Sequence, residues 1–238
     1  IGWLNRPGTT GETWNPVTGC TKISEGCAHC YAERMSKRLA GRFGYPAGDP
    51  FRVTVHSGRM RLPYSWRKAR TCFVCSMGDL FHDDVPAHEQ VNVWRAMADN
   101  PRHTFIVLTK RADKYLFAKV GRLAQAFGVL PNVWLGTTIE HYKHSYRAEY
   151  LRRCSAAVRF LSLEPLLSSM SDYPGIYDGM DWVIVGGETG SGARPMPPDW
   201  ARDVRDQCKS AGTPYFFKQM SNKAPIPEDL MVREWPNV

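Results

Sequence analysis

Three cysteines near the start of the chain are the residues whose type and spacing are best suited to chemistry. Cys20, Cys27 and Cys30 lie within eleven residues, and no fourth cysteine follows nearby. A structural zinc ion takes four ligands, and a cubane iron–sulfur cluster takes one cysteine for each iron. Three thiolates would therefore leave one iron of a [4Fe–4S] cluster with an open coordination position, where a reactant can bind.

Zinc is the main alternative for these cysteines. His29 or His56 could supply a fourth ligand and complete a closed structural site. His29 lies between two of the cysteines, so its side chain is expected to point elsewhere, and the gap of six residues between Cys20 and Cys27 fits a zinc ribbon poorly. The ligand count favours the cluster.

The other cysteines indicate a reducing environment and a packed core. The chain has seven cysteines, an odd number that argues against a fully paired disulfide framework. Cys72 and Cys75 lie in the apolar run 71–77, where we expect a strand. Because buried cysteine commonly behaves as a small hydrophobic residue, we assign this pair to the core.

The charge balance favours a polyanionic partner. The net charge is +8 and the pI is about 9.2. Residues 59–70 contain five cations with Tyr64 and Trp66 between them, a mixture that suits phosphates and stacked bases but also an ordinary solvated loop. The chain has no run apolar enough to span a bilayer and no secretory signal pattern, so we expect a cytoplasmic protein.

Short apolar runs alternate with stretches of helical spacing after the cysteine loop. Strands are expected at 71–77, 104–108, 132–137, 158–163, 182–185 and 214–218, with a first strand at 11–15. Helices are expected directly after Cys30 and at 87–100, 112–127 and 199–211. This alternation predicts an α/β fold with parallel strands, a partial TIM-like (β/α)6–7 barrel. We expect one domain over residues 1–238, with 41–68 as an insertion near the barrel mouth.

Polar and charged residues follow each of the expected strands. Because the carboxyl ends of parallel strands meet at one face, where barrel enzymes build their sites, these residues should form a composite site together with the cysteine loop. The strands end in Gly78-Asp79, Lys110-Arg111, Thr137-Thr138 and Glu140, Glu164, Glu188, and Lys218. The glycine-rich run 187–194 is not a Walker loop, because Ala193 and Arg194 stand where that loop needs Lys and Ser or Thr.

The cysteine loop resembles that of the radical S-adenosylmethionine (SAM) enzymes, with a first gap of six residues in place of the three that are commonest there. Three segments, 13–20, 162–166 and 186–190, are similar to the phage-type three-cysteine-motif family of that superfamily, and the likeness extends over most of the chain. The resemblance implies that Cys20, Cys27 and Cys30 hold a [4Fe–4S] cluster at the barrel mouth and that SAM binds the fourth iron.

The same resemblance implies roles for other residues. His29 would pack near the adenine of SAM, Gly78 and Asp79 would contact its methionine moiety, and Thr137, Thr138 and Glu140 would lie near its ribose. The substrate would lie above a second group of charged residues. These are Glu164, Glu188, Arg194 and Lys218. His82 is either a proton shuttle or a helix cap.

The implied activity is cleavage of SAM to a 5′-deoxyadenosyl radical that rearranges or modifies a substrate. The basic charge and the phage-type relatives favour a decorated nucleobase in DNA, with an isomerase or lyase type of reaction and a reductant such as flavodoxin. A phage-encoded protein of this kind would act in the host cytoplasm. Two alternatives stay open: a zinc-stabilised nucleic-acid-binding module without catalysis, and a radical SAM base-repair lyase.

Overall fold

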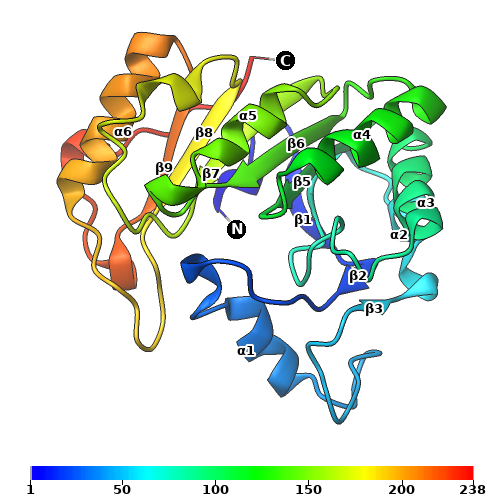
Figure 1. Ribbon diagram of the computed structural model, residues 1–238. Coiled ribbons are helices and arrows are strands. Elements are labelled where there is room, and N and C mark those ends of the chain that lie inside the picture. The colour runs from blue at the N-terminus through cyan, green and yellow to red at the C-terminus, as the bar shows by residue number, and fades with distance from the viewer. Residues whose placement is uncertain (1, 238) are drawn as a thin grey trace.

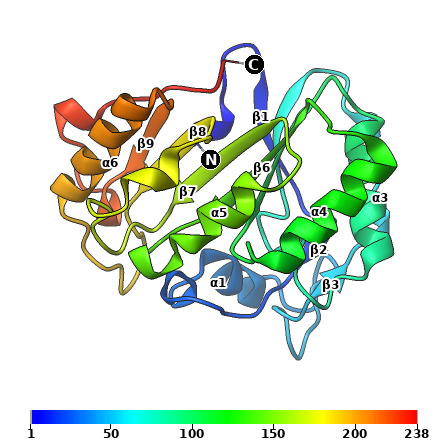
Figure 2. The same cartoon turned by 45° about the horizontal axis from the view of Figure 1, so that its top comes forward.

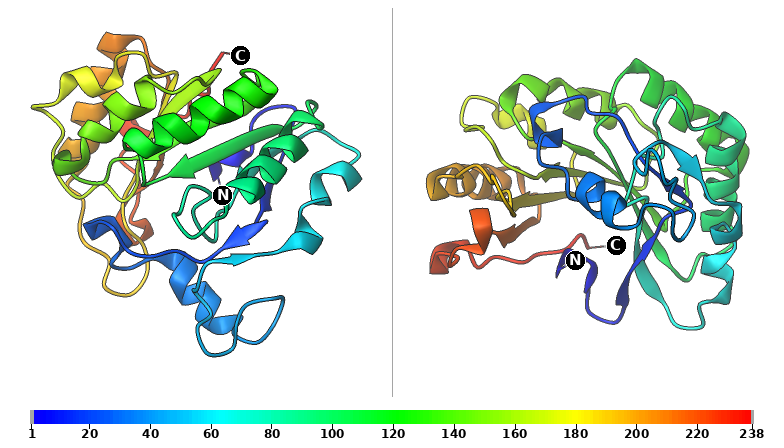
Figure 3. Two further views of the ribbon diagram at one scale, coloured as in Figure 1. Left: turned by 45° about the vertical axis from the view of Figure 1, so that its right-hand side comes forward. Right: turned by 90° about the horizontal axis from the view of Figure 1, so that it is seen from below.

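Seven parallel strands form one curled sheet with the order β1-β4-β5-β6-β7-β8-β9 (Figure 1). The computed structural model describes residues 2–237. The strands of this sheet are β1 (Thr10–Trp14), β4 (Arg70–Val74), β5 (Thr104–Thr109), β6 (Val133–Thr138), β7 (Val158–Leu163), β8 (Trp182–Gly186) and β9 (Tyr215–Gln219). Neighbouring strands pair in parallel throughout. The sheet curves into an open half-barrel (Figure 3), as the sequence predicts.

Helices cover the convex face of the sheet and carry the chain between parallel strands (Figure 2). They are α3 (Ala87–Ala98), α4 (Lys114–Phe127), α5 (Tyr146–Arg152) and α6 (Pro198–Ala211). Asp113 begins α4 by accepting hydrogen bonds from the backbone N–H groups of Tyr115 and Leu116. Gly212 ends α6 with a φ of +67°, a left-handed conformation that glycine adopts without strain.

The strands are apolar on both faces because both faces are covered. On β5, Phe105 and Val107 pack toward the helices, whereas Ile106 belongs to a second cluster on the concave face. Trp182 lies at the centre of that second cluster, and the centroid of its ring is 6.0 Å from that of Trp134 and 5.9 Å from that of Phe160. This aromatic layer closes the interior of the half-barrel.

The remaining elements lie at the carboxyl end of the sheet or fill its edges. Strand β2 (Val17–Thr18) pairs antiparallel with β3 (Thr54–Val55), and α1 (Tyr31–Arg38) and α2 (Leu62–Ser65) lie outside the main sheet. The short 3₁₀ helices are Gly2–Leu4, Glu25–Cys27, Ser57–Arg59, Tyr142–His144, Pro174–Tyr177, Ser221–Lys223 and Glu228–Leu230. Residues 41–68 run beside α1 and return through β3 toward the sheet (Figure 1).

The expected strands and helices are present, with shifts at their ends. The largest shift is in β4, which ends at Val74 instead of Met77, because Cys75 has a φ of +54° that breaks the extended backbone. Cys72 and Cys75 are 0% and 3% exposed, which confirms their assignment to the core. Within residues 2–237, no helix is both long and apolar enough to cross a membrane.

Candidate active site at the carboxyl ends of the strands

A pocket of about 530 Å³ opens at the carboxyl ends of the strands. Its floor includes Phe73 and Leu108 from the concave face of the sheet and Trp3 from the 3₁₀ helix Gly2–Leu4, which packs in the same cluster. Its walls combine the cysteine loop with residues at or just after the carboxyl ends of six strands. These wall residues include Ser76, Gly78, Asp79, Thr109, Lys110, Thr138, Ser162, Glu164, Gly187, Glu188, Lys218 and Gln219. The composite site expected from the strand ends is therefore a single concave space.

Cys20, Cys27 and Cys30 all line this pocket, and all three are half-buried free thiols. Cys27 ends a 3₁₀ helix, and Cys30 is the residue that precedes α1. Burial, followed by the charge of Asp79, raises the pKa of Cys20 to about 11, so binding of a metal would have to displace its proton. No three His, Cys, Asp or Glu side chains among residues 2–237 are close enough together to hold one metal ion.

The cysteine loop is held by backbone contacts with the end of β4. The amide of Gly19 donates to the carbonyl of Met77 at 2.9 Å, and Asn15 Oδ1 accepts from the amide of Met77 at 2.8 Å. A Cβ atom at Gly78 would lie 2.9 Å from the carbonyl oxygen of Gly19. Only glycine allows this approach of the two backbones.

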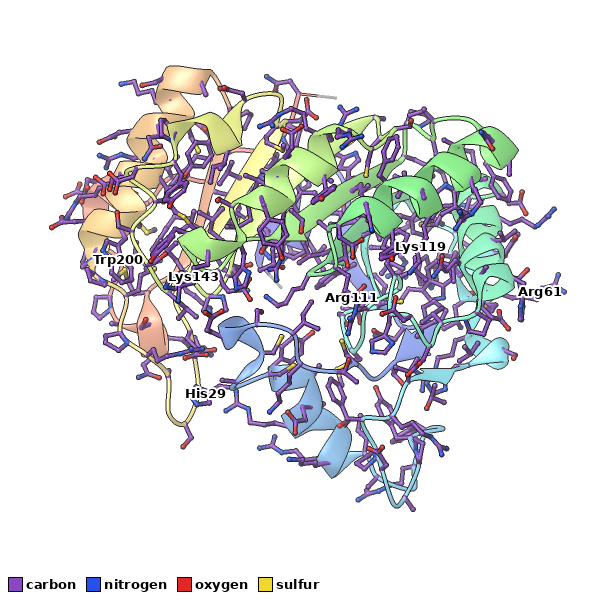
Figure 4. All side chains as sticks on the ribbon, viewed as in Figure 1. His29, Arg61, Arg111, Lys119, Lys143 and Trp200 are labelled. Atoms are coloured by element: carbon purple, nitrogen blue, oxygen red, sulfur yellow. The ribbon has the colours of Figure 1, made fainter. Side chains whose placement is uncertain are left out.

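Two side chains from different strand ends hold Thr21, the residue after Cys20. Arg111 Nη2 donates to Thr21 Oγ1 at 2.8 Å and lies 3.9 Å from Cys20 Sγ. His82 Nε2 lies 2.9 Å from the same hydroxyl, while its Nδ1 accepts from the amide of Asp84 at 3.1 Å. The His82 side chain is buried, with 4% of its surface exposed. Both of its ring nitrogens have partners, and through Thr21 it helps to position the cysteine loop. Figure 4 shows Arg111 directed toward this loop.

Asp79 joins the ends of β4 and β5. Its carboxylate accepts from Thr109 Oγ1 at 2.8 Å and from the amides of Phe81 at 3.0 Å and Lys110 at 3.3 Å. The side chain is buried, although the residue contributes to the pocket wall. Much of its hydrogen-bonding capacity is therefore used within the protein.

Thr137 and Thr138 end β6 and Glu140 follows it, and the three residues lie at different depths. Thr138 lines the pocket, whereas Thr137 is fully buried and donates to the carbonyl of Thr109 at 2.9 Å. Glu140 is also fully buried behind the cysteine loop, where it accepts from Arg147 Nη1 at 2.9 Å and from Ser24 Oγ. Burial opposes ionisation of Glu140, but the charges of Lys110 and Arg147 outweigh it and lower its pKa. Glu140 supports the loop rather than the pocket surface.

His29 and Arg194 both contact Glu188. Arg194 donates from Nε at 2.8 Å and from Nη2 at 2.6 Å, one bond to each carboxylate oxygen, and His29 Nδ1 lies 3.2 Å from Oε2. Burial opposes ionisation of Glu188, but the hydrogen bonds from Arg194 outweigh it and lower the pKa to about 2. Glu188 and His29 line the pocket, and Arg194 lies behind the carboxylate and also donates to the carbonyl of Glu25 at 3.0 Å.

Glu164 and Lys218 form a second charged pair that faces the pocket. Lys218 Nζ lies 2.8 Å from Glu164 Oε1, and both side chains line the cavity. They come from the ends of β7 and β9, which lie on either side of β8. Together with Glu188, this pair places both signs of charge on the pocket wall, an arrangement suited to a ligand with separated charges.

Lys110 follows β5 directly and lines the pocket, as expected for a residue at a strand end. Among residues 2–237 its buried Nζ has no hydrogen-bond acceptor, and it forms only an ion pair with Glu140 Oε2 at 3.5 Å. A buried ammonium without hydrogen-bonded acceptors is costly, so this group is suited to an anionic part of a ligand.

The basic stretch 59–70 is partly structural. Arg59 donates to the carbonyl of Asn15 at 3.1 Å, and Arg70 pairs with Glu12 at 2.8 Å. Arg61, Arg67 and Lys68 are exposed, and Figure 4 shows Arg61 on the outer side near α2.

The fold and the site thus define an α/β half-barrel with a cysteine-lined pocket at its carboxyl face. The chain belongs to the sequence family described as "Protein of unknown function (DUF5131)", which matches residues 8–231. A comparison with curated proteins gave no match. Among solved structures, spore photoproduct lyase complexed with dinucleoside spore photoproduct is similar, with a TM-score of 0.49 and 11% sequence identity. The match covers 80% of this chain and 58% of that one, which is less than two thirds of its length.

Proposed function

We propose that this protein is a radical SAM enzyme that modifies a nucleobase in DNA. The observation that carries the proposal is the convergence of three half-buried free thiols and six strand ends on one pocket. Three cysteine ligands suit a [4Fe–4S] cluster with one open iron.

The residues present fit both cofactors. The volume of about 530 Å³ lies within the usual range for small-molecule sites, roughly 300–1,000 Å³. The buried ammonium of Lys110 has no hydrogen-bond acceptor in the described part of the chain, and it offers a partner for the carboxylate of a bound amino acid such as the methionine moiety of SAM. Cys20, Cys27 and Cys30 would hold the cluster, which when bound and reduced would cleave SAM to methionine and a 5′-deoxyadenosyl radical.

The other pocket residues would bind and orient. His29 would lie against SAM with its ring fixed by Glu188, and Gly78, Asp79 and Thr138 would form the wall beside it. Thr137 and Glu140, which lie deeper, would support that wall and the cysteine loop.

The charged wall suits a substrate that carries an amino-acid-like group. Glu164 and Lys218 would bind its opposite charges directly, and Arg194 would act by holding Glu188 ionised and in place. The net charge of +8 favours a substrate within a polyanion. These features support rearrangement of a decorated pyrimidine in DNA, an isomerase type of reaction with an external electron donor such as flavodoxin.

Metal content and SAM cleavage test the proposal. After anaerobic reconstitution, iron and sulfide should approach the full content of a [4Fe–4S] cluster, and dithionite with SAM should release 5′-deoxyadenosine. Cys27→Ala should abolish the cluster. The matched control is Cys75→Ala, because burial raises the pKa of Cys75 to about 12 and keeps it a thiol, so this variant should retain iron. A colourless zinc protein, or iron lost equally from both variants, would contradict the proposal.

A further inference from the structure

An aromatic ring is exposed at the tip of a turn in the segment between α1 and β3. Phe43 is 74% exposed, and its φ of +52° is unusual for a residue other than glycine. The turn is closed by hydrogen bonds from the amide of Gly41 to the carbonyl of Tyr45 at 3.0 Å and from the amide of Tyr45 to the carbonyl of Arg42 at 2.9 Å. Exposure of the ring and its backbone conformation both cost free energy, which suggests that the ring has a use outside the fold.

The turn is anchored, so the ring has a fixed position. Arg59 donates to the carbonyls of Phe43 and Asn15, and its guanidinium carbon lies 5.8 Å from the centroid of the Tyr45 ring. Tyr45 itself is 5% exposed and packs with Ala32 and Met77. The turn is therefore joined both to α1 and to the end of β4.

The segment that carries Phe43 begins and ends at the pocket. Arg34 and Phe51 both line the cavity, and the residues between them project past α1, away from the sheet (Figure 1, Figure 3). We name residues 34–52 the arm. A molecule that rests on the arm would lie beside the pocket mouth.

The arm is strongly basic. Its charged side chains are all exposed, and five of the six are cations. They are Arg34, Lys37, Arg38, Arg42 and Arg52, with Asp49 as the single acid. Lys37 is paired with Glu33 at 3.2 Å, and Arg34 donates to the carbonyl of Thr189 at 3.3 Å. Arg38, at the end of α1, and Arg42, inside the turn next to Phe43, are both exposed.

We propose that the arm is the docking surface for duplex DNA and that Phe43 inserts between or stacks on its bases. This inference rests on the proposed function and deepens it. Chemistry on a base requires the base to leave the duplex, and apolar side chains that wedge between base steps lower the cost of unstacking. Cations that flank such a wedge bind the phosphates on either side. The arm would then open the duplex next to the pocket that receives the base.

The unstacking step is tested with duplexes that contain 2-aminopurine, whose fluorescence rises when it leaves the stack. The reconstituted protein should raise this fluorescence. Phe43→Ala should abolish the rise and weaken binding about tenfold, and Phe43→Trp should preserve both. Tyr115→Ala is the matched control, because Tyr115 is an aromatic residue that is 60% exposed and lies in the first turn of α4, outside the arm. A full fluorescence rise with Phe43→Ala would overturn the role of the ring.

The docking surface is tested by the salt dependence of binding. The logarithm of the DNA-binding constant falls linearly with the logarithm of the salt concentration. Arg38→Gln and Arg42→Gln should each make this slope shallower by about one, whereas Arg61→Gln in the stretch 59–70 should leave it unchanged. If Arg61→Gln changed the slope and the two arm variants did not, the DNA would bind residues 59–70 and the proposal that it binds the arm would be wrong. Binding to acidic vesicles without binding to duplex DNA would overturn it as well.

Two failures can be told apart in the same samples. If no cluster or 5′-deoxyadenosine forms, the proposed function fails whatever the DNA measurements show. If 5′-deoxyadenosine forms and a free modified nucleotide is converted while duplex DNA is not bound, the proposed function stands and the arm proposal is wrong.

Discussion

Arg111 donates hydrogen bonds from Nη2 to both oxygens of Thr21, to the carbonyl at 3.2 Å and to the hydroxyl at 2.8 Å. Thr21 follows Cys20, and Arg111 follows β5, so the first cysteine is tied to the rigid sheet across 90 residues of sequence. His82 contacts the same hydroxyl from the end of β4. The position of the first thiol is thus set by strand ends rather than by the loop itself.

Arg111→Met should loosen the cysteine loop while keeping a side chain of similar length. With both hydrogen bonds to Thr21 removed, the reconstituted cluster should release iron to a chelator several-fold faster, because a mobile ligand exchanges more readily. Arg61→Met, which changes an exposed arginine near α2, is the control. Equal release rates in the two variants would show that Arg111 does not position the loop.

Lys218→Met should impair substrate turnover and spare the cofactors. Hydrogen bonds to charged groups contribute about 1.5–3 kcal/mol, so kcat/KM should fall roughly 10- to 100-fold. Iron content and SAM binding should stay normal, because Lys218 comes from the end of β9 and its ion-pair partner is Glu164, not a cysteine. Lys209→Met on α6 serves as the control. Full turnover with Lys218→Met would move the substrate elsewhere on the pocket wall.

Acid should weaken the fold partly through Glu188. Its pKa falls from a usual value of 4.5 to about 2 in the folded chain, because hydrogen bonds from Arg194 outweigh the effect of burial. Below pH 4.5 the unfolded chain binds a proton that the folded chain does not, so stability from this group is present above pH 4.5 and is lost as the pH falls toward 2.

Urea unfolding between pH 6 and 3 measures this effect. Glu188→Gln should show a shallower loss of stability on acidification than the unmodified protein, whereas Glu228→Gln, at an exposed position, should follow the unmodified protein. An identical pH slope for Glu188→Gln would mean that the carboxylate is not stabilised by Arg194.

The strands were predictable because each is a short apolar run, and the strand-end rule placed Glu164, Glu188 and Lys218 on one wall. The end of β4 was not predictable, since the apolar run continues through Met77 and gives no sign of the left-handed backbone at Cys75. The roles of His82, Lys110 and Arg111 were also missed. Their contacts join residues far apart in sequence, and no local pattern encodes such proximity.

Arg194 and Glu140 illustrate the same limit in residues that the sequence did single out. Both lie near the site, yet Arg194 backs Glu188 and Glu140 is fully buried beneath the cysteine loop. Whether a strand-end side chain faces a pocket or supports its wall depends on how the following loop folds. For Glu140, that loop brings Arg147 to within 2.9 Å of the carboxylate.

The most direct test of the radical SAM assignment is the electron paramagnetic resonance spectrum of the reduced, reconstituted protein with and without SAM. Three cysteine ligands would leave one iron open, and SAM bound to that iron should change the g-values of the spectrum. Cys27→Ala should give no cluster spectrum in either condition. A well-formed cluster spectrum that SAM leaves unchanged would contradict the assignment.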